Sequence, residues 1–161
     1  EATCAFLEGV FREHLDGQPL HARHFVKWLN FPLVRNARWH GDRLVLLGDA
    51  LHTAHFSIGS GTKLAIEDAI ALTKALEAET AIPAALARYQ AERKPIVQKL
   101  VTAARTSADW YEHFPEHMKL DLMDFGYSYI TRSGRIDDAR LRAMSPAFMA
   151  RYEASKNGSQ A

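Results

Sequence analysis

The side chains best suited to chemistry lie in one segment of the sequence, where Asp49, His52 and His55 follow one another at intervals of three residues. An apolar run at 43–47 precedes this segment and a helical pattern of apolar residues at 62–77 follows it, so we expect a strand, a loop and a helix in that order. Ligands bind at the carboxyl ends of strands and at helix N-termini, because unpaired backbone N–H groups point outward there and favour negative charge. The pattern therefore predicts a site for a polar ligand in this loop.

Two residues at the end of the expected strand, Gly48 and Asp49, can take part in such a site directly. Asp49 would accept hydrogen bonds from the hydroxyls of a sugar or sugar alcohol, and Gly48 would let that ligand approach the backbone. The same pair also occurs in ordinary turns that bind nothing. The dipeptide by itself leaves both interpretations open.

Other kinds of site fit the segment less well. A phosphate-binding P-loop is excluded because Lys63 lies far beyond the end of the expected strand. A serine nucleophile elbow is excluded because the residue two before Ser60 is not glycine. Asp49, His52 and His55 would suit a metal-dependent phosphoesterase, but no second loop supplies the further ligands that such a site requires. A non-catalytic helical interaction domain is the remaining alternative to an enzyme.

The composition indicates an ordinary globular protein. The 161 residues carry a formal net charge of +1, with 47% hydrophobic and 24% charged residues, which excludes collagen-like, disordered and coiled-coil classes. The balance of 20 basic and 19 acidic residues gives no electrostatic footprint for nucleic acid, and no run of about 18 apolar residues is present to span a membrane. The single cysteine, Cys4, and an N-terminus without a signal-peptide pattern predict a cytoplasmic location.

Most of the chain is expected to be helical. Apolar spacing predicts a short amphipathic helix at 3–15 and a long helix at 83–111 that Pro95 kinks or interrupts. Aromatic and β-branched residues at 24–34 favour extended chain. The rest of the chain reads as further helices that end in a polar, flexible tail at 155–161. The predicted fold class is therefore α+β with helix dominating.

The segment after the expected strand resembles the second flavin-binding motif of the FAD-dependent aromatic hydroxylases, the monooxygenases typified by p-hydroxybenzoate hydroxylase. In that family, a strand followed by Gly-Asp-Ala-x-His leads through a loop to Gly-x-x-x-Ala-x-x-Asp-Ala. The corresponding residues here are Gly48-Asp49-Ala50-Leu51-His52 and Gly61-Thr62-Lys63-Leu64-Ala65-Ile66-Glu67-Asp68-Ala69. The chain departs from the family where His55-Phe56 replaces a usual Pro-Pro pair, and it is more similar there to the narrower group of salicylyl-CoA 5-hydroxylase and 2-aminobenzoyl-CoA monooxygenase.

This resemblance implies a flavin site. Asp49 would hold the ribityl chain of FAD, and the backbone amides at the start of the next helix would face the pyrimidine edge of the flavin, where they favour the negative charge of its reduced form. His52 would either contact the cofactor or hydrogen-bond to backbone carbonyls. The implied sites contain no catalytic side chain and no metal; the cofactor-binding residues are Gly48, Asp49, Gly61, Thr62, Lys63 and Leu64, and the substrate-lining residues are His55 and Phe56.

The resemblance also implies a reaction. The intact enzyme would hydroxylate an electron-rich aromatic compound, presented as a CoA thioester in the narrower group. It would consume NAD(P)H and dioxygen and act through a flavin C4a-hydroperoxide. The expected partners are therefore the small aromatic substrate, the FAD cofactor and the NAD(P)H co-substrate.

One part of the family pattern is missing. The pyrophosphate-binding Gly-x-Gly-x-x-Gly of the family's N-terminal βαβ unit does not occur here, so we expect a C-terminal portion of a longer hydroxylase that is inactive alone. Its missing N-terminal part would be a partner, and the apolar face left exposed would promote association into a homo-oligomer. Residues 1–154 would form this portion, with the end of a substrate sheet at 20–40, the second flavin motif at 43–76 and closing helices at 83–154.

Overall fold

The computed structural model describes residues 2–20, 29–42 and 44–158, and the chain divides into two compact units, Glu1–Pro32 and Leu33–Ala161. The boundary falls inside the region 20–40, which we expected to be one piece of sheet. None of the helices in the described ranges combines the length and the apolar character needed to cross a membrane.

The first unit contains two short helices, α1 (Ala2–Val10) and α2 (Arg12–Leu15). They confirm the helix predicted at 3–15, with an interruption at Phe11. The path ends at Asp16, whose φ of 45° lies in the left-handed region, and Gly17 follows with a φ of 78°.

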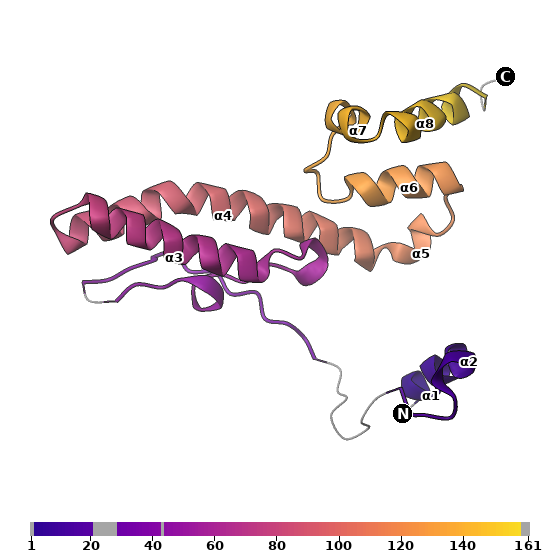
Figure 1. Ribbon diagram of the computed structural model, residues 1–161, viewed down its shortest axis with the longest axis horizontal. Coiled ribbons are helices and arrows are strands. Elements are labelled where there is room, and N and C mark those ends of the chain that lie inside the picture. Colours follow the sequence, from indigo (N-terminus) through magenta and orange to yellow (C-terminus); the bar gives the residue numbers. More distant parts are fainter. Residues whose placement is uncertain (1, 21–28, 43, 159–161) are drawn as a thin grey trace. The chain divides into compact units, whose positions relative to one another are not determined.

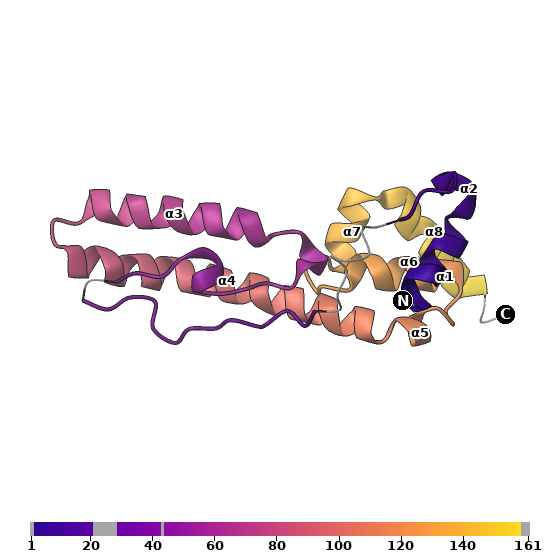
Figure 2. The same ribbon diagram turned by 90° about the horizontal axis from the view of Figure 1, so that it is seen from below.

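The centre of the second unit is a pair of helices, α3 (Gly61–Ala78) and α4 (Ile82–Glu112). They lie side by side along most of α3 (Figures 1 and 2), because a short connection turns the chain back on itself. Both confirm the helices predicted at 62–77 and 83–111. α4 begins with Pro83 in its first turn. It continues as one helix through Pro95, so the interruption expected there does not occur, although proline supplies no N–H.

The segment before α3 is extended but forms no regular strand among the described residues. It contains two isolated bridges, Arg35 with His52 and His40 with Val45, followed by two 3₁₀ turns, η2 (Gly48–Ala50) and η3 (Phe56–Ile58). The predicted strand at 43–47, covered on both faces, is therefore wrong for residues 44–47, where Leu44 is 64% exposed, and residue 43 lies outside the described ranges.

A strand requires neighbours that pair with its backbone along its length. In the described part of the chain, the run that includes Val45 pairs only with the residues around Trp39, through the bonds from Leu46 N to Trp39 O and from Gly41 N to Leu44 O, each 2.8 Å. The sheet expected at 20–40 is likewise absent from residues 29–40, and residues 21–28 lie outside the described ranges. The β part of the predicted α+β class is thus reduced to isolated bridges, while the helical part is confirmed.

The core of the helical pair includes Leu51 from the extended segment, Leu64 from α3 and Tyr89 from α4, each at most 1% exposed. The Tyr89 hydroxyl donates to the backbone oxygen of Leu46 at 3.3 Å, and burial raises the pKa of Tyr89. The extended segment is therefore held to both helices by apolar packing and by this hydrogen bond.

The rest of the unit consists of four helices, α5 (Phe114–His117), α6 (Leu122–Thr131), α7 (Asp138–Met144) and α8 (Pro146–Gly158). Asp121 and Asp137 cap the starts of α6 and α7 by accepting hydrogen bonds from backbone amides. The helical reading of this region is confirmed. Residues 155–158 of the expected flexible tail are helical, because α8 continues to Gly158, and residues 159–161 lie outside the described ranges.

Replacing Met149 by alanine should destabilise the second unit by about 2–5 kcal/mol, because the side chain is 1% exposed and its loss leaves a cavity. The matched control is Met144→Ala, whose side chain is 62% exposed. Denaturant unfolding followed by circular dichroism measures both free energies. Equal effects of the two substitutions would contradict the packing of α8.

Candidate functional site

The site begins with an unusual backbone position at Gly48, the first residue of η2. Its φ is +58°, in the left-handed region that favours glycine, and a Cβ at this position would lie 3.2 Å from the Cβ of Ala65 in α3. We expected this glycine to let a ligand approach the backbone. The structure adds that the glycine lets α3 pack closely against the turn.

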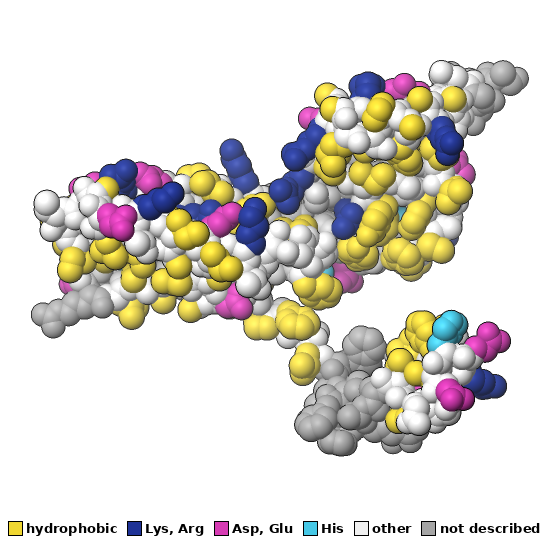
Figure 3. All heavy atoms as spheres, viewed as in Figure 1, with side chains coloured by type: hydrophobic (Ala, Val, Ile, Leu, Met, Phe, Trp, Pro, Cys, Tyr) yellow, Lys and Arg dark blue, Asp and Glu magenta, His cyan; other side chains and the backbone are white. Residues whose placement is uncertain are grey.

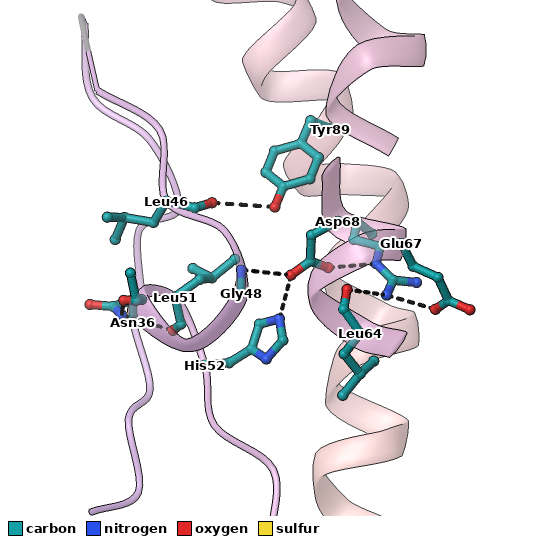
Figure 4. Close-up of polar contacts among 11 residues, drawn as sticks. Asn36, Leu46, Gly48, Leu51, His52, Leu64, Glu67, Asp68 and Tyr89 are labelled. Atoms are coloured by element: carbon teal, nitrogen blue, oxygen red, sulfur yellow. Dashed lines mark hydrogen bonds and ion pairs between the residues drawn. The ribbon is translucent and has the colours of Figure 1, made fainter. Parts of the chain in front are cut away.

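A buried carboxylate joins this turn to the two long helices. Asp68 of α3 is fully buried. Its Oδ2 accepts a hydrogen bond from the Gly48 amide at 3.0 Å and lies 2.7 Å from Nε2 of His52, and its Oδ1 accepts from Nε of Arg93 in α4 at 2.7 Å. Figure 4 shows these groups converging from three segments of the chain. We call Gly48, His52, Glu67, Asp68 and Arg93 the Asp68 cluster.

Arg93 extends the cluster along α3. Its Nη2 donates to the backbone oxygen of Leu64 at 3.2 Å and to Oε2 of Glu67 at 2.8 Å, and the residue is 5% exposed. One guanidinium of α4 therefore holds the first two turns of α3. Such planar, several-donor recognition is what arginine provides and lysine does not.

The charges in the cluster stabilise one another. Burial by itself would raise the pKa of Asp68, but the hydrogen bonds from His52, Arg93 and the Gly48 amide outweigh burial and hold the pKa below its ordinary value. The hydrogen bond from Arg93 lowers the pKa of Glu67 in the same way. Burial opposes the charge of Arg93, and its hydrogen bonds to the two carboxylates raise its pKa. Asp68 is therefore an ionised acceptor of these hydrogen bonds.

The predicted cofactor-binding residues lie around this cluster. Asp49, next to Gly48 in η2, is exposed, and so are Gly61, Thr62 and Lys63 at the start of α3. Leu64 is buried, and its amide donates to Ser60 O at 2.9 Å. η2 packs directly against α3. The structure thus brings the Asp49 turn beside the first turns of α3, and it places Leu64 in the core.

These residues fit a flavin nucleotide. In the described part of the chain, the amides of Gly61, Thr62 and Lys63 donate to no protein acceptor, as expected for the first turn of a helix. They are donors for an oxygen or an anion, while Asp49 is an exposed acceptor for hydroxyls. A ligand with hydroxyls at one end and electron-rich oxygens at the other matches that arrangement.

The predicted substrate-lining pair lies on the next turn. His55 and Phe56 stack with ring centroids 4.3 Å apart, and Phe56 is 70% exposed. The turn is attached to the helices through Ser57, whose hydroxyl donates to Ala104 O at 3.4 Å and whose backbone oxygen accepts from Arg132 Nη2 at 3.4 Å. The loop therefore presents the exposed Phe56 ring, stacked on a half-buried His55, from a turn that is fixed to the helices.

The metal alternative requires Asp49, His52 and His55 to converge. His52 is instead buried against Asp68, whereas Asp49 is exposed. Within the ranges 2–20, 29–42 and 44–158, no group of three or more His, Cys, Asp or Glu side chains is arranged to hold a metal ion. Nε2 of His52 pairs with the Asp68 carboxylate and not with a backbone carbonyl, which was one of the two roles expected of this residue.

Sequence reasoning missed the roles of Asp68 and Arg93. A signal for Arg93 was present, because it follows Tyr89 and precedes Val97 at helical spacing, on a stripe that is otherwise apolar. A charged residue in such a stripe is buried with a partner. Asp68 occupies the equivalent position on α3, four residues after Leu64.

Residues 18–104 match the FAD binding domain family, and this range covers more than half of the chain. The chain therefore belongs to the FAD binding domain family. The matched range contains η2, η3, α3 and most of α4, and it includes every residue of the Asp68 cluster.

Among known proteins, the chain is 41% identical to salicyloyl-CoA 5-hydroxylase of Streptomyces sp over 156 residues. The aligned region covers 95% of this chain and 30% of the relative. It is 38% identical over 146 residues to protodeoxyviolaceinate monooxygenase of Chromobacterium violaceum, covering 91% of this chain and 37% of that protein. It is 42% identical over 110 residues to 3-hydroxy-4-methyl-anthranilyl-[aryl-carrier protein] 5-monooxygenase of Streptosporangium sibiricum, covering 68% of this chain and 30% of that protein. The chain thus spans about a third of the length of these relatives.

Gly48→Ala should destabilise the second unit by about 1–2 kcal/mol, because alanine is strained in the left-handed conformation. The close contact of the new methyl group with Ala65 adds a further loss of stability. Gly59→Ala is the control, since its φ is +60° and nothing lies within 4 Å of a Cβ there. Thermal or denaturant unfolding should therefore rank Gly48→Ala below Gly59→Ala in stability. The reverse order would contradict the close packing of η2 on α3.

The free energy of unfolding should fall as the pH drops below about 4, the ordinary pKa of aspartate. The folded-state pKa of Asp68 is lowered, so its contribution is complete above that ordinary value and is lost as the pH falls through the folded pKa. Asp68→Asn should flatten this acid dependence, and the exposed Asp42→Asn should leave it unchanged. Acid titrations of denaturant stability measure the difference; parallel curves for wild type and Asp68→Asn would refute the ion pair.

Proposed function

We propose that this chain is the second flavin-binding part of an FAD-dependent monooxygenase that hydroxylates an electron-rich aromatic compound. The observation that carries the proposal is the Asp68 cluster, because it holds the exposed Asp49 turn beside the unpaired amides at the start of α3. Membership of the FAD binding domain family and the names of the relatives support the same activity.

In this proposal the chain binds and orients the cofactor. The Asp49 carboxylate accepts hydrogen bonds from the ribityl hydroxyls, and the amides of Gly61, Thr62 and Lys63 donate to the pyrimidine edge of the ring system. The start of α3 carries about half a unit of positive charge, which favours a negatively charged reduced flavin by about 1 kcal/mol. Bound FAD supplies the redox chemistry, taking reducing equivalents from NAD(P)H and activating dioxygen.

The aromatic pair His55–Phe56 faces the substrate in the proposed enzyme. An exposed phenyl ring on a turn that Ser57 fixes to the helices offers apolar surface to an aromatic substrate and excludes water from the site. The proposed mechanism requires no acid or base from the described residues. Protein side chains here position the reactants.

The substrate class that we propose is an aryl thioester. Two of the relatives are named for acyl groups carried on CoA or on an aryl-carrier protein, and both carriers present the aromatic ring through a thioester. A cytoplasmic location fits an enzyme that consumes NAD(P)H.

The remaining partner that we propose is the rest of the flavin-binding domain. Ile66 and Ile70 are 57% and 49% exposed on the face of α3 opposite the buried Leu64 and Asp68. Figure 3 shows hydrophobic side chains, in yellow, at the surface of the second unit. We propose that this face packs against the part of the enzyme that binds the FAD pyrophosphate, which would bury it.

The intact protein should purify as a yellow flavoprotein, and Asp49→Ala should weaken its FAD binding about tenfold, the equivalent of 1.4 kcal/mol, because the hydroxyls lose a charged acceptor. Flavin fluorescence during titration of the apoprotein measures the dissociation constant.

The control is Asp42→Ala, which removes another exposed carboxylate from the turn before η2. It should leave FAD binding unchanged. A colourless intact protein, or an Asp49→Ala variant that binds FAD as tightly as wild type, would refute the assignment of Asp49.

A further inference from the structure

The Asp68 cluster raises a question that stability alone does not answer, namely why the chain buries an ion pair beside the flavin site. Burying a carboxylate and a guanidinium carries a desolvation penalty, and well-packed apolar residues of similar volume often give equal or greater stability. Asp68 and Arg93 are nevertheless 0% and 5% exposed. Their contacts are directional, and all of them lead to the two segments that carry the proposed FAD ligands.

On one side, the pair controls the turn that carries Asp49. In the described part of the chain, the polar contacts that join residues 48–52 to α3 are those of Gly48 and His52 with Asp68 Oδ2. The left-handed φ of Gly48 allows its amide to point at that oxygen. Asp49, the next residue, has its backbone direction set by this contact.

On the other side, the pair controls the start of α3. Arg93 bonds to the Leu64 carbonyl and to Glu67, in the first two turns of the helix. The amides of Gly61, Thr62 and Lys63 belong to the same turns. Asp68 and Arg93 together therefore fix the distance between the Asp49 carboxylate and these amides.

We propose that Asp68 and Arg93 are positioning residues of the flavin site, which set the spacing between the ribityl acceptor on η2 and the amide donors on α3. This inference rests on the proposed function and goes beyond it, because both side chains are buried and act through other groups that would bind the cofactor. Asp68 acts through Gly48 and Asp49, and Arg93 acts through Asp68 and the α3 backbone.

The test is a double-mutant cycle in the intact flavin-containing protein. Asp68→Asn should weaken FAD binding about tenfold. In metal sites, loss of a residue that supports a ligand lowers the affinity by about 10- to 100-fold, and the effect expected here lies at the lower end of that range. In an Asp49→Ala background the same substitution should cost less than about threefold, because the group through which it acts is gone. A purely structural role for Asp68 would multiply the two losses, and that result would overturn the proposal.

The midpoint potential of the bound flavin is the second readout. Asp68→Asn should make it more negative, because a displaced Asp49 turn holds the flavin farther from the amides of α3, which then stabilise its reduced, negatively charged form less well. A general loss of protein stability would not move the potential of the flavin that remains bound. An unchanged potential in the variant would also overturn the proposal.

Arg93→Lys keeps the test decisive if Asp68→Asn does not fold. It retains the positive charge but loses the fork that reaches Asp68, Leu64 and Glu67 together, and it should weaken FAD binding about threefold or more with a more negative potential. The matched control is Arg88→Met on α4, which removes an arginine whose partners, Glu79 and Glu92, lie at the surface. Arg88→Met should leave affinity and potential unchanged.

The outcomes separate the two proposals. An Asp49→Ala variant with unchanged FAD affinity would refute the role of Asp49 in the proposed function. A weakened Asp49→Ala variant, together with wild-type affinity and potential in Asp68→Asn and Arg93→Lys, would leave the flavin function in place and refute the positioning role alone.

Discussion

The structure of the second unit depends on one buried carboxylate. Asp68 uses both oxygens, one for Arg93 and the other for the Gly48 amide and His52, so a single side chain joins a turn and two helices that lie far apart in the sequence. A buried ionised group is tolerated only when its hydrogen-bonding capacity is filled. Each of these three partners is therefore required by the charge that it satisfies.

This constraint explains residue choices that otherwise look unrelated. Gly48 must adopt a left-handed φ to direct its amide to Asp68, and it must lack a Cβ because Ala65 lies close by. Position 93 requires the several donors of arginine because one guanidinium reaches two carboxylates and a backbone oxygen. The two halves of the flavin motif, separated by a loop, are thus one hydrogen-bonded unit.

The extended segment illustrates the opposite situation, in which local preference lacks a partner. Residues 44–47 are all apolar, as in a buried strand, yet Leu44 is largely exposed and, among the residues that the structure describes, the pairing is limited to those near Trp39. β structure arises from pairing between segments, whereas a helix satisfies its backbone within itself. Helices such as α3 and α4 are therefore complete in this chain, and the strand is not.

The sequence by itself determined the helices predicted at 62–77 and 83–111, the glycine-rich loop between the extended segment and α3, and the FAD binding motif. These features follow from local periodicity and from the order of residue types. Only the tertiary structure decided that His52 faces Asp68, that Arg93 closes the cluster from α4, and that the described residues of the expected strand pair only with the residues near Trp39. Such contacts join residues distant along the chain, and the free energy of a buried charge depends on all its neighbours at once.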